Sequence, residues 1–285
     1  TGLADFADGG GAGITLDDAY DFGTLLFNSA GTVTISEDSN TVLAGTSTAD
    51  ALDLDSAGSI SNNAGASLTV TNNADFADSG GSGITLGAQA GDTMNFGSLT
   101  FNSTGAVEVQ ENSAMALEGA STADSADLVA SGAITDNTDA DLAVTGNASF
   151  AGTSITIGDE GNNTDNFGSL TFSSGGAVAI AEDSATELSG ASSANSLDLD
   201  SGGAITDDNT PSVTVTNNAD FADGAGAGIT LDDTYNFGSL TFNSTGAVEI
   251  DESSATVLSG VSTADSLDLD STGSITDDGT ADVTV

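Results

Sequence analysis

The chain contains four copies of one segment of about 71 residues, and this internal repeat constrains the fold more than any other feature. A Phe-Gly-x-Leu-x-Phe motif marks each copy, and successive motifs begin 74, 71 and 70 residues apart. A further phenylalanine heads each copy, so all 12 phenylalanines occupy repeat positions. The motifs are Phe22–Phe27, Phe96–Phe101, Phe167–Phe172 and Phe237–Phe242. Such a period predicts a solenoid or an array of similar units.

The four repeat units comprise residues 1–70, 71–144, 145–215 and 216–285. Each unit divides into three sub-repeats of roughly 20 to 27 residues. In the last unit the alignment places Ala219–Phe221, Ser239–Phe242 and Ser266–Leu269 at equivalent positions. Each sub-repeat has three short apolar-polar-apolar segments, which is the period of a half-buried strand. Spacing varies only between these segments, as expected for surface corners between packed strands.

Glycines recur after two of these strands, and we expect them to lie at turns where a positive φ has no steric cost. They are Gly23, Gly97, Gly168 and Gly238 after one strand, and Gly31, Gly105, Gly176 and Gly246 after the next.

Three short strands per sub-repeat predict an all-β fold, a right-handed parallel β-helix solenoid of about twelve coils. Stacking at about 4.8 Å per coil would give a rod of about 57 Å. The alternative is an array of β-sandwiches with one domain per repeat unit. The solenoid is favoured because the strands span only about three to five residues and because similar sub-repeats lie within each unit.

Two segments carry a resemblance to a known group of proteins. Residues 96–108 and 237–249 both read Phe-Gly-Ser-Leu-Thr-Phe-Asn-Ser-Thr-Gly-Ala-Val-Glu, and residues 266–277 read Ser-Leu-Asp-Leu-Asp-Ser-Thr-Gly-Ser-Ile-Thr-Asp. They resemble the repeats of bacterial large exoproteins, of the filamentous-haemagglutinin-like and autotransporter-like β-helix type. The resemblance implies an extracellular, surface-attached or shed fibrous protein whose shaft is a parallel β-helix.

The charge of the chain excludes many functions. It has 44 acidic residues, no lysine, arginine or histidine, and a formal net charge of −44. Nucleic-acid binding through a basic surface, histidine acid-base catalysis and lysine Schiff bases are therefore excluded. The chain also has no cysteine for a thiol nucleophile or a zinc site. We expect no enzyme, no catalytic, cofactor-binding or metal-ligating residues, and no transmembrane segment, since no apolar run reaches about 18 residues.

Acidic residues recur at repeat positions and form the candidate site. One glutamate lies ten residues after each Phe-Gly motif, and a serine follows it two residues later. The pairs are Glu37 and Ser39, Glu111 and Ser113, Glu182 and Ser184, and Glu252 and Ser254. One interpretation is a calcium or other divalent-cation corner assisted by Asp38, Asp183 and Asp251; the other, which is favoured, is a solvated corner that caps backbone amides. No cofactor is required in either case, and no established calcium-loop motif is present.

A second acidic corner is predicted from Asp207, Asp208, Asp277 and Asp278. Carboxylate pairs such as those of glycoside hydrolases also occur, but they recur where a catalytic pair is normally unique. We therefore interpret them as outward-facing strand residues. The pairs are Asp53 and Asp55, Asp198 and Asp200, and Asp268 and Asp270.

Three further patterns are weaker. Outward threonines suggest an ice-binding face; they are Thr15, Thr85, Thr156 and Thr230. A charged residue interrupts this face, because the series from coil to coil is Thr230, Glu249 and Thr276. Core residues two positions before a phenylalanine are Tyr20, Met94 and Tyr235, and Asp165 at that position in the third unit predicts a distorted coil. The N-glycosylation pattern occurs at Asn102, Asn147, Asn162 and Asn243.

The first and last residues fit each other as repeat neighbours. Val285 ends a strand whose interior equivalents continue into Thr-Asn-Asn-Ala-Asp-Phe, and the chain begins with Thr-Gly-Leu-Ala-Asp-Phe. This favours an excerpt of a longer array over separate chains that stack head to tail. Either way the partner is the protein itself, stacked as a continuous solenoid or a filament, with counterions around it. We expect a structural extracellular fibre or filament shaft on a cell surface or in an extracellular matrix. The alternative is an adhesin shaft that presents a binding tip; a calcium- or ice-binding solenoid is less favoured.

Overall fold

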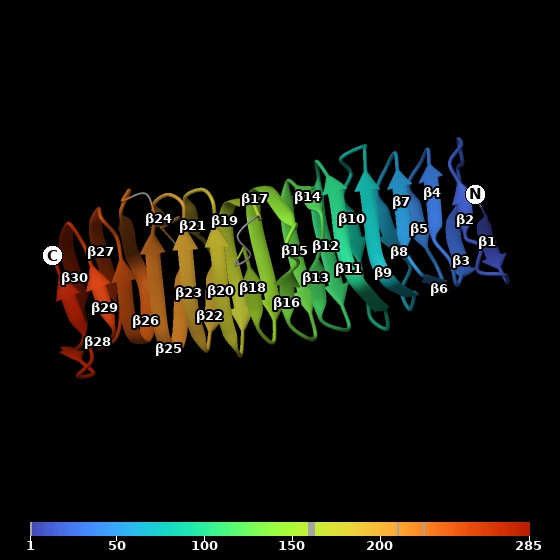
Figure 1. Ribbon diagram of the computed structural model, residues 1–285. Coiled ribbons are helices and arrows are strands. Elements are labelled where there is room, and N and C mark those ends of the chain that lie inside the picture. The colour runs from blue at the N-terminus through green and yellow to red at the C-terminus, as the bar shows by residue number, and fades with distance from the viewer. Residues whose placement is uncertain (1, 159–162, 210, 225) are drawn as a thin grey trace. The chain divides into compact units, whose positions relative to one another are not determined.

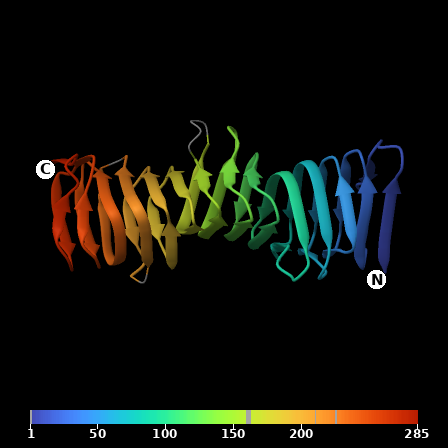
Figure 2. The same cartoon turned by 90° about the horizontal axis from the view of Figure 1, so that it is seen from below.

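The computed structural model describes residues 2–158, 163–209, 211–224 and 226–285. These residues form 32 β-strands and no helix, so no helix among them could cross a membrane. The chain divides into two compact units, residues 1–145 and 146–285, each of which holds about two repeats. Within each unit the strands of successive coils lie side by side, as Figures 1 and 2 show.

Unit 1 contains the first 16 strands and part of the next, β17 (Asp141–Gly152), which contains the division. The strands are β1 (Leu3–Asp8), β2 (Ile14–Leu16), β3 (Thr24–Ser29), β4 (Val33–Glu37), β5 (Thr41–Leu43), β6 (Thr46–Ala49), β7 (Leu52–Ser56), β8 (Ile60–Asn62), β9 (Ser67–Asp78), β10 (Ile84–Leu86), β11 (Thr93–Ser103), β12 (Ala106–Glu111), β13 (Met115–Leu117), β14 (Ala120–Ala123), β15 (Ser125–Ala130) and β16 (Ile134–Asp136).

Unit 2 contains the strands after β17. They are β18 (Ile155–Ile157), β19 (Asp165–Ser174), β20 (Ala177–Glu182), β21 (Thr186–Leu188), β22 (Ala191–Ala194), β23 (Ser196–Ser201), β24 (Ile205–Asp207), β25 (Ser212–Asp223), β26 (Ile229–Asn243), β27 (Ala247–Glu252), β28 (Thr256–Leu258), β29 (Val261–Thr263), β30 (Ser266–Ser271), β31 (Ile275–Asp277) and β32 (Asp282–Thr284).

Parallel pairing between coils defines a β-solenoid in each unit. In unit 1, Ile14, Val33, Leu52 and Ala74 are successive register partners, 19, 19 and 22 residues apart. The described residues form about 13 coils, close to the twelve expected. The predicted parallel β-helix is therefore confirmed, and the β-sandwich array is not formed.

Aromatic side chains of the repeat meet on adjacent coils in the core. Phe76 is the register partner of Phe101 in unit 1, and Phe221 is the partner of Phe242 in unit 2. All four side chains are fully buried. The rings of Phe76 and Phe96 lie 5.7 Å apart between centroids. Because each coil exposes an apolar face that only its neighbours cover, the repeated phenylalanines stabilise stacking between coils.

The predicted sub-repeat alignment is correct for two of its three members. Ala219 pairs with Leu240, and Phe221 pairs with Phe242. Leu267 instead pairs with Val248 of β27, because the coils are shorter than a third of a repeat. Equivalent segments of one repeat therefore do not all stack on one another.

The glycines predicted to have positive φ do not have it. Gly97 and Gly238 are required for close approach instead: a Cβ atom at either position would lie 2.2 Å from a backbone carbonyl oxygen, of Thr71 or Thr216. Both lie where the register of a long strand shifts. Any side chain would push the two coils apart there, so these positions need glycine for space and not for torsional freedom.

Asp165, which was predicted to distort its coil, keeps a hydrogen bond that its equivalents in other repeats make. It is 1% exposed, at the buried position held by Met94 and Tyr235 in other repeats. The backbone N–H of Asp183 donates to the Asp165 carbonyl at 2.9 Å. The equivalent bond from Ser253 to Tyr235 is 2.8 Å, so this bond is kept with an acid in place of an aromatic ring.

Candidate functional site: carboxylates at the corners and on the strand faces

The four repeat glutamates are buried, each at the end of a strand. Glu37, Glu111, Glu182 and Glu252 are 2 to 4% exposed. In each, Oε1 accepts a hydrogen bond from the backbone N–H of the phenylalanine 15 residues earlier, at 2.8 to 2.9 Å. The serine two residues later donates its hydroxyl to the same oxygen at 2.7 to 3.2 Å. The glutamates therefore cap backbone amides, as the favoured interpretation predicted, but that interpretation was wrong about the surroundings: the carboxylates are buried and not solvated, and the amides that they cap lie 15 residues earlier in the chain.

Whether the second oxygen of each carboxylate has a hydrogen-bond donor depends on the residue four positions later. Thr41 donates to Glu37 Oε2 at 2.7 Å, and Thr186 donates to Glu182 Oε2 at 2.8 Å. Burial raises the pKa of Glu182, and the hydrogen bonds from Phe167, Ser184 and Thr186 oppose that rise. These neutral donors hold the carboxylate in a chain that has no cationic side chain to pair with it.

Two buried aspartates, Asp78 and Asp223, have a similar role that the sequence analysis missed. Asp78 is 2% exposed and accepts hydrogen bonds from Gly80 N (3.0 Å), Gly83 N (2.6 Å) and Ser103 Oγ (3.0 Å). Asp223 accepts from Gly228 N at 2.6 Å. The available signal was an Ala-Asp-Phe-Ala-Asp segment with glycine five residues after its second aspartate, which occurs at both places and at Asp8.

The predicted corner of four aspartates is not formed as one cluster. Asp207 instead lies beside Asp232 and Asp233 of β26, with one carboxylate oxygen from each within 4.8 Å of the others. The Tyr235 hydroxyl donates to Asp207 Oδ2 at 2.7 Å, and Asp232 N donates to the same atom at 3.0 Å. Burial, followed by the charges of Asp207 and Asp232, raises the pKa of Asp233. This is the arrangement of hard oxygen ligands that a divalent cation would accept.

Two more of the four aspartates in that prediction, Asp277 and Asp278, cap their own loop. Asp277 accepts from Gly279 N at 2.9 Å, and Asp278 accepts from Thr280 N at 2.8 Å and from its hydroxyl at 2.6 Å. The Thr280 hydroxyl bond is the main cause of the lowered pKa of Asp278.

The paired carboxylates of the Leu-Asp-Leu-Asp strands face their counterparts on the next coil. Asp53 is the register partner of Asp75, and Asp198 is the partner of Asp220. Burial, then the charges of Asp53 and Asp55, raise the pKa of Asp75. Like charges directly opposite on paired strands are destabilising. Because the arrangement occurs in both units, it is a property of the repeat surface.

The third pair, Asp268 and Asp270, has acidic neighbours as well. The pair lies opposite Glu249 and Asp251 on β27. Burial and the charge of Asp270 are the first two causes of the raised pKa of Asp251.

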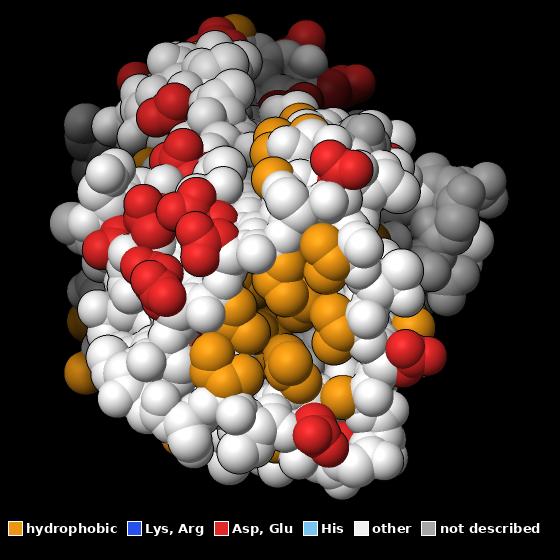
Figure 3. All heavy atoms as spheres, turned by 90° about the vertical axis from the view of Figure 1, so that its left-hand side faces the viewer, with side chains coloured by type: hydrophobic (Ala, Val, Ile, Leu, Met, Phe, Trp, Pro, Cys, Tyr) orange, Lys and Arg blue, Asp and Glu red, His pale blue; other side chains and the backbone are white. Residues whose placement is uncertain are grey.

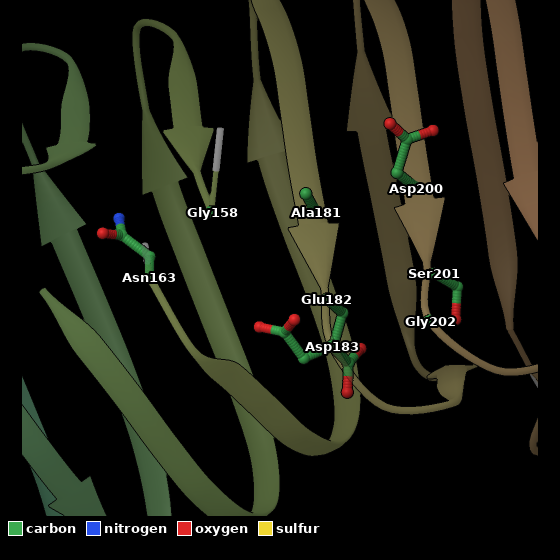
Figure 4. Close-up of a pocket in the computed structure, with 8 residues that line it drawn as sticks. All are labelled: Gly158, Asn163, Ala181, Glu182, Asp183, Asp200, Ser201 and Gly202. Atoms are coloured by element: carbon green, nitrogen blue, oxygen red, sulfur yellow. The ribbon is translucent and has the colours of Figure 1, made fainter. Parts of the chain in front are cut away.

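An acidic groove follows this face in unit 2. Two adjoining hollows of about 300 and 310 Å³ share Gly158, Ala181 and Asp200 in their walls. Figure 4 shows the Asp200 carboxylate on β23, one coil away from Ala181 on β20. Asp198 lines the second hollow, and Asp183 lines the first.

The predicted interruption of the threonine face by charge is correct, although the series differs. Thr230 pairs with Glu249, and Glu249 pairs with Asp268. Thr276 lies in another column, opposite Val257. Thr85 also pairs with a glutamate, Glu108. These columns do not form the uninterrupted threonine array that ice binding would need.

Asn147, one of the four glycosylation-pattern residues, makes hydrogen bonds within unit 2. Its Oδ1 accepts from Ser169 (3.0 Å), Thr171 (3.2 Å) and Ser189 (2.9 Å). Asn102 Oδ1 accepts from Thr122 at 3.2 Å. Asn243 is half-buried, and Asn162 lies outside the described residues.

Comparison with protein families gives one match. The family model Repeats of unknown function (DUF5649) matches residues 30–100, 104–171 and 175–243. The chain belongs to this family. No curated protein and no solved structure matches it.

The DUF5649 segments begin 74 and 71 residues apart, the same steps as the first two between Phe-Gly motifs. Each segment starts with the strand that carries the buried glutamate and ends with the next Phe-Gly strand. Glu111 bonds to Phe96 of the preceding segment, and Glu182 bonds to Phe167 in the same way. The buried glutamate thus joins one DUF5649 repeat to the one before it.

Proposed function

We propose that this DUF5649 chain is a structural fibre or filament shaft, extracellular, on a cell surface or in a matrix. The observation that carries the proposal is that the recurring side chains of the repeat hold coil to coil. Glu182 accepts a hydrogen bond from Phe167 N at 2.9 Å, and Phe221 is the register partner of Phe242 on the next coil, with both side chains buried. The proposal includes no catalytic role, since the paired aspartates recur as a surface feature in both units.

The proposal includes further coils stacked on the last coils of unit 2, contributed by more of the same array or by a second copy of the chain. In unit 2 the segment Leu197–Ser201 pairs with Ala219–Asp223, and in unit 1 the same two sequences pair at Leu52–Ser56 and Ala74–Asp78. Residues 267–271 of β30 and 4–8 of β1 carry these sequences again. A second copy can therefore place its Ala4 opposite Leu267 in the register already used inside each unit.

The last coils of unit 2 have apolar side chains available for such a contact. Val261, Ile275, Val283 and Val285 are 36 to 66% exposed. Figure 3 shows apolar side chains gathered in the middle of this end, with acidic side chains along one side. An apolar surface rimmed by polar groups favours association.

The extracellular assignment is supported by composition and by the resemblance to bacterial large exoproteins. The chain has no lysine or arginine, so trypsin-like proteases have no site to cleave. The negative charge keeps neighbouring shafts from associating sideways unless salt screens it.

Negative-stain microscopy of the purified 285-residue chain tests the proposal. We expect rods of uniform width whose length grows with protein concentration. Ile275→Glu should shorten them, because it puts a charge into the apolar contact. Thr276→Glu adds the same charge one residue away, on the other side of the strand, and should have less effect. Single particles that never lengthen would overturn the stacking proposal.

Cohesion should also depend on cations. We expect melting at a higher temperature in millimolar calcium than in EDTA at low salt, because the facing aspartates repel one another. Equal melting temperatures would contradict the cation dependence but would not bear on the proposal of a fibre.

A further inference from the structure

The second repeat differs from the others at one core position beside its buried glutamate. The first and third repeats have Thr41 and Thr186 there, and both donate to the second carboxylate oxygen. The second repeat has Met115, which is fully buried and has no hydroxyl. Glu111 Oε2 consequently has no hydrogen-bond partner among the described residues, although Glu111 is only 4% exposed.

The fourth repeat has a threonine at this position, so it can be compared with the second repeat, which has no donor there. Thr256 occupies the position and is fully buried, but neither its hydroxyl nor Glu252 Oε2 has a partner among the described residues. The fourth repeat therefore keeps a hydroxyl donor at this position. No movement of Met115 can supply a donor to Glu111.

A buried oxygen without a donor destabilises the ionised form of a carboxyl group more than the neutral form. Burial is the main influence on Glu111 and raises its pKa. The Phe96 N–H and the Ser113 hydroxyl, at 2.8 and 2.7 Å from Oε1, oppose this rise. Burial raises the pKa of Glu182 as well, but Glu182 has a third opposing donor, Thr186, that Glu111 lacks.

Neighbouring charge is not the cause of this effect. The acids on or next to the elements around Glu111 are Asp92 before β11, Glu108 on β12, Glu118 after β13, Asp127 on β15 and Asp136 on β16. Glu108 and Asp127 are register partners, one half-buried and the other exposed, and Glu118 is exposed. None of these acids contributes to the raised pKa of Glu111, which comes from burial alone.

We propose that Glu111 holds its proton at pH values at which exposed acids are ionised, and that it makes the join between β11 and β12 responsive to pH. The folded chain then binds this proton more tightly than the unfolded chain does. Its contribution to stability is complete below the pKa of an unfolded glutamate, and it is lost as pH rises through the higher pKa of the folded state. Alkaline conditions therefore weaken the join between β11 and β12.

Equilibrium unfolding across the range from about pH 4 to about pH 8 tests this inference with matched variants. Glu111→Gln cannot ionise, so it should melt several degrees above the wild-type chain at the upper end and lose that advantage at the lower end. Met115→Thr restores the hydroxyl donor to Glu111, so the melting temperature of this variant should also fall less than that of the wild-type chain as pH rises. Glu37→Gln is the control: Glu37 already has its threonine, so this variant should show no gain at high pH.

Carbon-13 NMR of the Glu111 carboxyl in the folded wild-type chain supplies a readout that does not depend on the variants folding. We expect Glu111 to titrate above the exposed glutamates, and Met115→Thr to move its midpoint back towards theirs. Titration together with the exposed acids would overturn the proposal. So would a Glu111→Gln variant that gains no more than Glu37→Gln at high pH.

Discussion

Two aspartates three residues apart on β9 show opposite uses of the same side chain. Asp78 is buried and accepts hydrogen bonds from two backbone N–H groups and a serine hydroxyl. Asp75 is half-buried, and its register partner on the previous coil is another aspartate, Asp53. The inward carboxylate is matched by donors, and the outward one faces a like charge. In a chain without cations, the side of the strand decides whether an acid stabilises the fold or destabilises it.

The same contrast recurs in unit 2. Asp223 accepts from Gly228 N, whereas Asp220 faces Asp198 and has one carboxylate oxygen without a partner among the described residues. Burial, then the charges of Asp198 and Asp200, raise the pKa of Asp220. Since the two units repeat the contrast, it can be tested in either one.

Removing an inward carboxylate should have the largest effect. Glu182→Ala leaves the Phe167 N–H without its acceptor and creates a cavity beside Thr186. We therefore expect a loss of about 3 kcal/mol in the free energy of unfolding. Chemical denaturation followed by circular dichroism measures it. Glu187→Ala removes an exposed glutamate of β21 and should change stability by less than about 0.5 kcal/mol. Equal losses in the two variants would mean that burial of the carboxylate has no special value.

Neutralising the inward aspartate of β9 should have the next largest effect. Asp78→Asn puts an amide N–H where donors already point, so one of the bonds to Gly80, Gly83 or Ser103 is lost. We expect destabilisation of about 1 to 2 kcal/mol. The matched substitution in unit 2, Asp223→Asn, should act in the same direction, and a stabilising result in either unit would contradict the capping role.

The outward aspartate of the same strand should respond with the opposite sign. Asp75→Asn removes its repulsion with Asp53, and we expect a gain of about 0.5 kcal/mol at low ionic strength. Molar salt should erase the gain because it screens exposed charges. Asp265→Asn, at an exposed corner, is the control with the same change in net charge. If Asp75→Asn gains no more than this control at low salt, register pairing of the aspartates has no energetic consequence.

The smallest predicted effect is the pH dependence of that gain. The pKa of Asp75 is raised in the folded chain, so its contribution to stability is complete below the ordinary aspartate pKa and is lost as pH rises through the folded value. The advantage of Asp75→Asn should therefore be absent near pH 3 and present at pH 7, roughly the range over which aspartates ionise. Melting curves of both proteins at these two pH values check it, and an advantage that is larger at acid pH would show that the sign is wrong.

Much of the fold could be predicted from residue spacing. The recurrence of phenylalanine and the apolar-polar-apolar segments indicate a stack of short strands, and the parallel pairing of Phe221 with Phe242 confirms it. The position of the third sub-repeat on the coils could not be predicted. The number of residues in a coil depends on the length of each corner, and the predicted alignment of Leu267 did not include corner lengths. The glutamates could be found by their period, but their burial could not, since glutamate is normally exposed.

The sequence by itself determined the periodicity and the parallel solenoid. It also excluded chemistry that needs a cationic side chain or a thiol. These conclusions follow from residue types and their spacing. Only the tertiary structure decided which carboxylates point inward. Glu111, Asp78 and Asp75 are alike as acids in the sequence, and their roles differ. Register between coils places the Phe96 N–H beside Glu111 and another aspartate beside Asp75, whereas the loop after β9 turns its own Gly83 N–H onto Asp78. Register depends on the lengths of corners that lie one coil apart, and no local pattern contains that information.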